Sequence, residues 1–168
     1  MKRQNMILYV LTILLVLMTP ALAAQVSTDD VDSVSIGVIV GEPTGLSIKL
    51  WLSDVSAIDI ALAWSFTDNG AFYANADYLT HFFDVFTTAP DRLPVYVGVG
   101  GSLRVQSQAP GQGDPDSRLR AAVRVPVGIS FLPVELPLDL FFELAPHLRI
   151  FPETTFGVAG GIGVRYRF

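Results

Sequence analysis

Ionisable side chains alternate with large apolar side chains along most of this sequence. An alternation with a period of two predicts β-strands, so the ionisable residues of each segment fall on one face. Burying a charge without a partner is costly, whereas carboxylates and cations on one face can pair. We therefore expect an interlocked, structural charge network. Its members are Lys49, Asp59, Asp77, Arg124, Asp139, Glu143, Arg165 and Arg167.

A second set of cations lies near the other ends of the segments. It consists of Arg104, Arg118, Arg120 and Arg149. The guanidinium group offers a planar fork of donors that suits carboxylate and phosphate groups. Two interpretations stay open: these arginines pair with acids of the nearby loops, or they contact anionic groups such as lipopolysaccharide headgroups.

The residue types needed for catalysis are few. His147 could act as a base and Ser102 or Ser117 as a nucleophile. The other histidine, His81, is expected near the opposite end of the barrel from His147, so the two should not act together. Any sequence of this length offers one His and one Ser. We therefore predict no catalytic site, no metal site and no cofactor. The alternative is a hydrolase or acyltransferase that modifies lipid A.

Eight strand-like segments position these residues, and turn residues such as Pro, Gly and Asn separate them. Only the loop 107–117 is long. Eight sequential strands without helices predict an all-β fold, an eight-stranded antiparallel up-and-down barrel. Pro126 and Pro146 cannot donate to a strand ladder, so we interpret both as bulges. The segments are 33–41, 46–52, 57–66, 71–85, 94–106, 118–131, 138–150 and 155–168.

The composition indicates which face of the barrel points outward. Hydrophobic residues make up 51% of the chain and charged residues only 16%. An eight-stranded lumen is just wide enough to be filled with side chains, so it could not hold all the large apolar ones, as a soluble lipocalin-like barrel would require. The apolar face must then face lipid, with two aromatic girdles. Trp64, Phe66, Phe72 and Phe156 form one girdle, and Phe82, Phe131, Tyr166 and Phe168 the other.

The N-terminus carries an export pattern. Lys2 and Arg3 precede an apolar run and a small-residue stretch that ends at Ala24. This pattern predicts a cleaved signal peptide at residues 1–24, a polar arm at 25–32 and the barrel at 33–168. The net charge of −5 becomes −7 when Lys2 and Arg3 are removed, which argues against nucleic acid as a partner. We expect a monomer.

The last strand closes on Arg165-Tyr166-Arg167-Phe168. This ending resembles that of small bacterial outer-membrane barrels of the OmpA/OmpX type. The segments 41–49 (GEPTGLSIK), 57–65 and 124–128 resemble an uncharacterised family of such barrels. The resemblance implies an outer-membrane location and lipid contacts. It also implies that Val164, Tyr166 and Phe168 form a signal read by the barrel-assembly machinery, with periplasmic chaperones as further partners.

Taken together, we expect an integral outer-membrane barrel with a polar, plugged interior and a structural role in the envelope. It could also contact lipopolysaccharide at its rim. The alternatives are a lipid-modifying enzyme of the outer leaflet and a narrow pore for small solutes.

Overall fold

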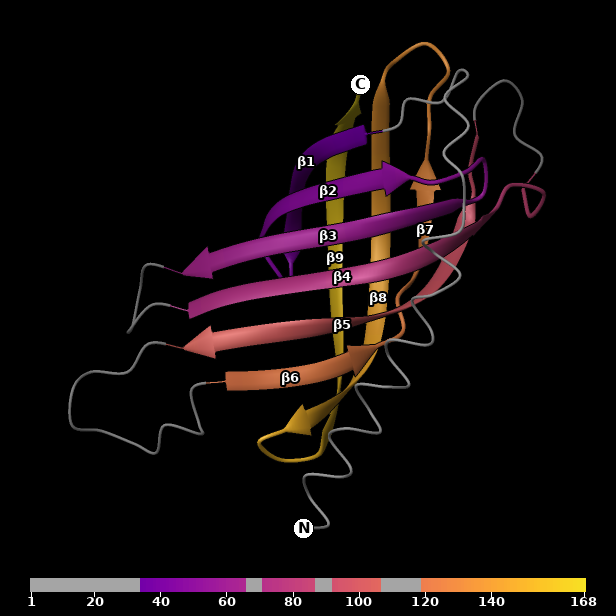
Figure 1. The fold of residues 1–168 in the computed structure, drawn as a ribbon. Helices are drawn as coiled ribbons and strands as arrows, with labels where there is room; N and C mark the ends of the chain where they lie inside the picture. Colours follow the sequence, from indigo (N-terminus) through magenta and orange to yellow (C-terminus); the bar gives the residue numbers. More distant parts are fainter. Residues whose placement is uncertain (1–33, 66–70, 87–91, 107–118) are drawn as a thin grey trace.

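A computed structural model describes residues 34–65, 71–86, 92–106 and 119–168. These residues form nine antiparallel strands in one sheet (Figure 1), which confirms the predicted all-β fold. The strands are β1 (Val34–Gly41), β2 (Gly45–Trp51), β3 (Ser56–Ser65), β4 (Ala71–Phe82), β5 (Val95–Gln106), β6 (Leu119–Arg124), β7 (Val127–Phe131), β8 (Leu138–Phe151) and β9 (Thr155–Arg167). The predicted signal peptide and polar arm lie outside the described residues, as do Phe66, Ser117 and Arg118.

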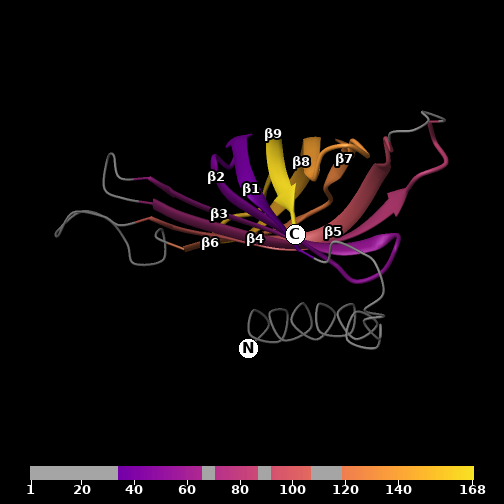
Figure 2. The ribbon, with the colours of Figure 1, turned by 90° about the horizontal axis from the view of Figure 1, so that it is seen from above.

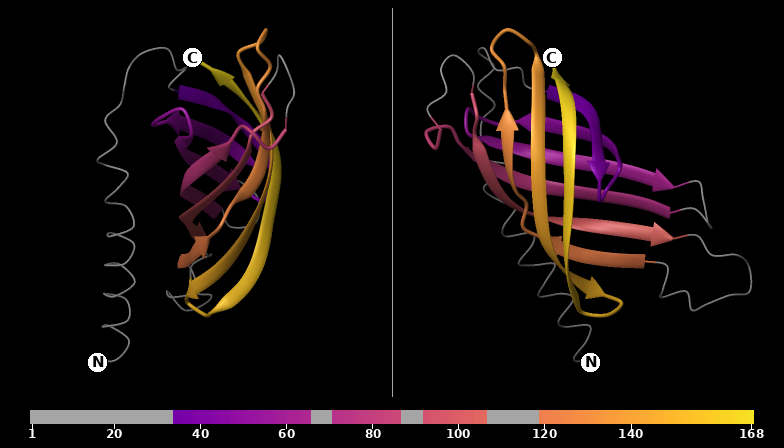
Figure 3. Two further views of the ribbon diagram at one scale, coloured as in Figure 1. Left: turned by 90° about the vertical axis from the view of Figure 1, so that its right-hand side faces the viewer. Right: turned by 180° about the vertical axis from the view of Figure 1, so that it is seen from behind.

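The strand pairings form a closed ring. β1 to β5 pair in sequence order, β8 pairs with β9, and β9 pairs back onto β1. β6 and β7 do not pair with each other but together fill one position between β5 and β8. Eight positions thus close the barrel, and β3 to β6 cross β8 and β9 on the opposite wall (Figures 1 and 3). Seen from above, the sheet curves around its axis (Figure 2).

The predicted strand 118–131 is interrupted at Pro126, between β6 and β7. Pro126 has no N–H to donate, yet its carbonyl accepts a hydrogen bond from Gly98 at 2.8 Å. Pro146 stays inside β8, and its carbonyl accepts from Val125 at 2.9 Å. The prediction of bulges at the two prolines is therefore wrong. The register shifts instead at Ala121 and Ala122, opposite Phe151 and Arg149.

The strands are staggered around the barrel. A row of cross-strand partners that starts at Arg167 on β9 passes Lys49, Asp77 and His147 and returns to β9 at Gly157. The row therefore climbs by ten residues (167 against 157) in one circuit. A stagger of this kind tilts the strands against the barrel axis. Because the strands are tilted, two cross-strand partners lie at different heights along the barrel axis.

The two faces of the sheet differ sharply. Large apolar side chains point outward along every wall, among them Val38, Leu103, Leu144 and Ile162, the last with 63% of its surface exposed. Aromatic side chains are exposed at both ends: Trp64, Phe72 and Phe156 at one, and Phe82, Tyr166 and Phe168 at the other. Inward positions hold the ionisable residues together with glycine, serine and alanine, and with some larger side chains, among them Ile39, Leu79, Tyr96 and Phe141. Within the described ranges, no helix is long and apolar enough to cross a membrane.

Candidate functional site: a charge-filled lumen and a cationic vestibule

Four charged side chains from four strands meet in the half of the lumen nearer the C-terminus. We name Lys49, Asp59, Asp139 and Arg165 the lower cluster. Arg165 Nη1 and Lys49 Nζ each lie 3.0 Å from Asp139 Oδ2, and Arg165 Nη2 lies 2.5 Å from Asp59 Oδ2. Arg165 Nε also donates to Ser47 Oγ at 2.9 Å. Two positive and two negative charges therefore balance where water is excluded.

A second group of charges lies above the first, toward the end of the barrel where β1 joins β2 and β8 joins β9, which we call the far end. We name Asp77, Arg124 and Glu143 the upper cluster. Arg124 Nε lies 3.3 Å from Asp77 Oδ2, and Arg124 Nη2 donates to Glu143 Oε1. Arg124 Nη1 donates to the Tyr73 hydroxyl at 3.1 Å. One arginine thus joins β4, β6 and β8 across the lumen.

Tyr96 lies between the two clusters. Its hydroxyl donates to Glu143 Oε2 at 3.1 Å, and Lys49 Nζ lies 5.3 Å from its ring centroid. The tyrosine is fully buried, and Gly128 leaves the room that it needs. A Cβ at Gly128 would come within 2.3 Å of Tyr96 Cζ. Glu143, the most exposed ionisable residue of the two clusters, shows only 7% of its surface, so these side chains fill the lumen.

The structure places seven of the eight predicted network residues in these two clusters. Arg167 lies apart and donates to the carbonyls of Pro133 and Leu136, each at 3.0 Å. Lys49 belongs to the lower cluster, where it pairs with Asp139. The reason is that Lys49 stands two residues from the end of β2 and is the cross-strand partner of Asp59.

Sequence reasoning missed the uncharged partners Tyr73 and Tyr96 and placed His81 outside the network. His81 Nε2 lies 3.4 Å from Lys49 Nζ, and its ring packs 4.4 Å from that of Trp51. The alternation of faces along β5 would have placed Tyr96 in the lumen, because Tyr96 shares the inward face of β5 with Gly98, Gly100 and Ser102. Aromatic residues, however, were assigned to the two girdles of the lipid face, and no inward aromatic residue was predicted.

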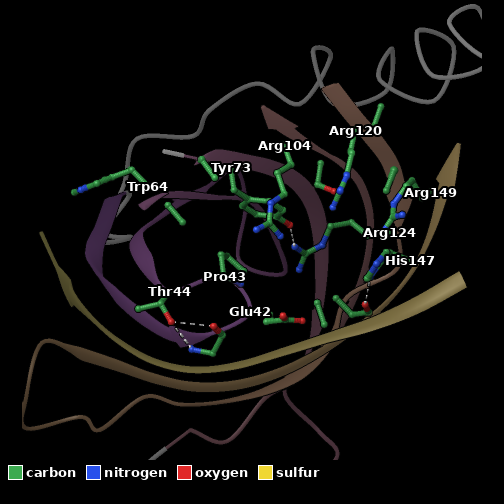
Figure 4. Close-up of a pocket in the computed structure, with 18 residues that line it drawn as sticks. Glu42, Pro43, Thr44, Trp64, Tyr73, Arg104, Arg120, Arg124, His147 and Arg149 are labelled. Atoms are coloured by element: carbon green, nitrogen blue, oxygen red, sulfur yellow. Dashed lines mark hydrogen bonds between the residues drawn. The ribbon is translucent and has the colours of Figure 1, made fainter. Parts of the chain in front are cut away.

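A cavity of about 540 Å³ opens at the far end above the upper cluster (Figure 4). We call it the vestibule. Arg104, Arg120, Arg149 and His147 lie on one side of it, and the β1–β2 turn with Glu42 lies on the other. Its floor includes Arg124 and Tyr73. Alanines help to create the space; those on the lining are Ala63, Ala71, Ala121, Ala122, Ala145 and Ala159.

Three of the four arginines predicted as an anion contact thus come together in the vestibule. Arg104 and Arg120 are cross-strand partners, and Arg149 is the partner of Ala122. In the part of the chain that the structure describes, none of the ion pairs includes Arg104, Arg120 or Arg149. None of these arginines pairs with Glu42 or Glu153, the loop acids that the structure describes. The other predicted loop acids, Asp68, Asp114 and Asp116, lie outside the described residues, as does Arg118.

The candidate catalytic pair also borders the vestibule, since both His147 and Ser102 line it. The described residues show no hydrogen bond between them: His147 Nδ1 lies 3.3 Å from the carbonyl oxygen of Ala145. Ser117 lies outside the described residues. Nor do the described residues contain a group of three or more His, Cys, Asp or Glu side chains that could hold a metal ion.

The three residues of the predicted C-terminal signal lie on the outer face of β9. Val164, Tyr166 and Phe168 expose 36%, 49% and 65% of their surfaces, and the rings of Tyr166 and Phe168 pack edge to face with centroids 5.0 Å apart. The strand is held by β1 and β8, because Phe168 N donates to Val34 O at 2.9 Å and Arg167 N to Pro137 O at 2.8 Å.

No known family model matches this sequence, and no curated protein is significantly similar to it. Among solved structures, the fold is similar to the N-terminal β-barrel domain of Pseudomonas aeruginosa OprF. The TM-score is 0.54 and the sequence identity 14% over 80% of this chain and 95% of that domain. This similarity shows that the two chains share a β-barrel fold.

Proposed function

We propose that this protein is an integral β-barrel of the bacterial outer membrane, with a closed lumen and a structural role in the envelope. One observation carries the proposal: buried ion clusters fill the inside of a closed ring whose outside is apolar. In water, such a continuous apolar exterior would promote aggregation. In lipid, it is the surface that a closed barrel presents, because all backbone polar groups are paired within the ring.

The exposed aromatics support the membrane orientation. Trp64 and Phe72 are cross-strand partners near the far end, and Tyr166 and Phe168 lie at the other end. Aromatic side chains at both ends of an apolar band are typical of membrane barrels. The export pattern of residues 1–24 and the similarity in fold to the OprF barrel domain support the outer membrane as the location.

This orientation fixes which partners we propose. The protein is a monomer whose apolar face contacts outer-membrane lipids. The outward residues of β9 are those that the barrel-assembly machinery would recognise. We place the C-terminal end on the periplasmic side, so the vestibule opens outward from the cell. No enzymatic activity is proposed, because His147 donates to a carbonyl and makes no dyad with Ser102 among the described residues.

Planar-bilayer recording of refolded residues 25–168 tests the closed lumen. The two clusters cross the lumen from six different strands, so we expect no stable conductance steps. A porin inserted under the same conditions is the positive control. Reproducible steps from the wild-type protein would contradict the closed lumen and favour the narrow pore.

The enzyme alternative has its own test in cells. Expression of the wild type and of His147→Ala, followed by mass spectrometry of lipid A, should give the same lipid profile as cells without the protein. A modified lipid species that depends on His147 would contradict the structural role.

A further inference from the structure

We propose that the vestibule is a binding site for a phosphate-bearing anion, held by Arg104, Arg120 and Arg149. This inference goes beyond the structural role proposed above, and it does not depend on whether the lumen conducts. It rests on the charge, the space and the closed floor of the vestibule.

The charge argument begins with a row of three cross-strand partners. Tyr73 on β4, Arg104 on β5 and Arg120 on β6 lie side by side and line the same cavity. Like charges directly opposite each other destabilise a sheet. The other charges of the lumen are closely paired, whereas Arg104 and Arg120 form no ion pair among the described residues, so this row favours the binding of an anion.

Arg149 adds the third cation from the adjoining wall. It is the partner of Ala122 on β6 and points into the cavity beside His147 (Figure 4). The one carboxylate on the lining is Glu42, which lies across the vestibule in the β1–β2 turn and forms none of the ion pairs found among the described residues. The described lining therefore carries a clear excess of positive charge.

The vestibule has space for more than an ion. Its volume of about 540 Å³ falls within the range of roughly 300–1,000 Å³ that is typical of small-molecule sites. The space exists because Ala122 on β6 and Ala145 on β8 bring only methyl groups to the lining, where longer side chains would fill it. An organic phosphate or a pyrophosphate group fits this space.

The vestibule is closed at its lower end, so it is a binding site and not a passage through the lumen. Arg124 is held there by Asp77, Glu143 and the Tyr73 hydroxyl, so its own charge is compensated from below. A ligand above it would meet the Tyr73 and Ser102 hydroxyls and the ring of His147. His147 Nδ1 faces the carbonyl of Ala145, and its ring lies over Gly157, where an added Cβ would come within 2.7 Å of Nε2.

The ligand class follows from the geometry of the donors. Each guanidinium binds oxyanions through two parallel N–H groups, and three guanidiniums from three strands can surround one tetrahedral group from several sides. A planar monocarboxylate would satisfy only one of them. The phosphate group has two sources: a soluble phosphorylated compound that enters from outside, or a lipid headgroup that reaches over the rim.

Calorimetric titration of refolded residues 25–168 in detergent with inorganic pyrophosphate tests the site. We expect saturable binding of one equivalent. Arg104→Gln, Arg120→Gln and Arg149→Gln should each weaken it about tenfold or more, because each removes a charge-assisted contact. Arg92→Gln is the matched control: Arg92 is exposed at the opposite end, so its loss should leave the affinity unchanged.

A second kind of variant, Ala122→Leu, tests the site without removing any charge. The larger side chain fills the cavity between Ser102 and Arg149, so it should also weaken pyrophosphate binding. The heat-sensitive electrophoretic mobility of each variant shows whether it is folded, and only folded variants enter the comparison. If no arginine variant folds, the Ala122 variant alone decides.

A parallel arm identifies the source of the phosphate. Micelles doped with lysophosphatidic acid, whose headgroup is a phosphomonoester, should raise the melting temperature of the wild type more than that of Arg149→Gln if the ligand is a lipid. A response to pyrophosphate alone identifies a soluble ligand. The proposal is overturned if neither compound binds the wild type, or if the vestibule variants respond as Arg92→Gln does.

Discussion

Arg165 and Asp139 are cross-strand partners on β9 and β8, and Arg165 Nη1 donates to Asp139 Oδ2 over 3.0 Å in a fully buried environment. The same carboxylate oxygen lies 3.0 Å from Lys49 Nζ. One aspartate therefore compensates two cations, and the stability of the lower cluster depends on it.

The first prediction concerns Asp139→Asn. The change leaves two buried cations with Asp59 as their only carboxylate partner in the lower cluster, and loss of one member of a buried ion pair costs about 3–5 kcal/mol. Urea unfolding in lipid vesicles, followed by tryptophan fluorescence, measures the free energy of unfolding. Asp54→Asn is the matched control in an exposed turn and should change it by less than about 0.5 kcal/mol. Equal stability of the two variants would refute the role of Asp139.

The second prediction concerns Glu143→Leu in the upper cluster. The substitution removes the acceptor of both Tyr96 and Arg124, so a buried hydroxyl and part of a guanidinium lose their partner. We expect a lower melting temperature in detergent, equivalent to a loss of about 3 kcal/mol. Glu135→Leu, in the exposed connection after β7, is the control. An unchanged melting curve for Glu143→Leu would show that the upper cluster does not stabilise the barrel.

The third prediction tests the packing around Tyr96. Gly128→Ala would place a methyl group within 2.4 Å of the tyrosine hydroxyl oxygen, so Tyr96 must move away from Glu143. Overpacking of this kind costs about 1–3 kcal/mol. Gly101→Ala is the control, since its nearest neighbour would lie 3.6 Å away. If both variants unfold at the same urea concentration, the filled lumen is not tightly packed.

The fourth prediction compares arginine substitutions at two depths of the lipid-facing surface. Leu144 lies in the middle of β8 and exposes 47% of its surface, whereas Phe156 lies near the far end of β9. An arginine at the bilayer midplane costs roughly 2–4 kcal/mol, and one near the interface about 0–1. Leu144→Arg should therefore reduce stability in vesicles much more than Phe156→Arg. A soluble barrel would tolerate both changes equally.

The strands were predictable because alternation and turn chemistry are local properties. The first strand was expected at 33–41 and runs from Val34 to Gly41; the last was expected at 155–168 and runs from Thr155 to Arg167. Sequential hairpins then determine which strands are neighbours. The interruption at Pro126 was misjudged because the ladder adjusts around a missing donor in two ways, by a bulge or by a break, and local sequence does not distinguish them.

The contacts across the lumen were not predictable in the same way. Asp59 and Arg165 are separated by more than a hundred residues, and whether they meet depends on the stagger accumulated around the whole ring. Likewise, neither strand alone shows that Lys49 and Asp139 lie at the same level of the lumen. The vestibule depends on the same stagger, because it places Arg104, Arg120 and Arg149 at one height.

Electrophoresis of residues 25–168 with and without boiling, after refolding either in detergent micelles or in plain buffer, tests the central claim most directly. The account predicts a compact band that shifts on boiling when detergent is present, and aggregation when it is absent. A folded, monomeric protein in plain buffer would contradict the claim that the apolar face is the outside of a membrane barrel.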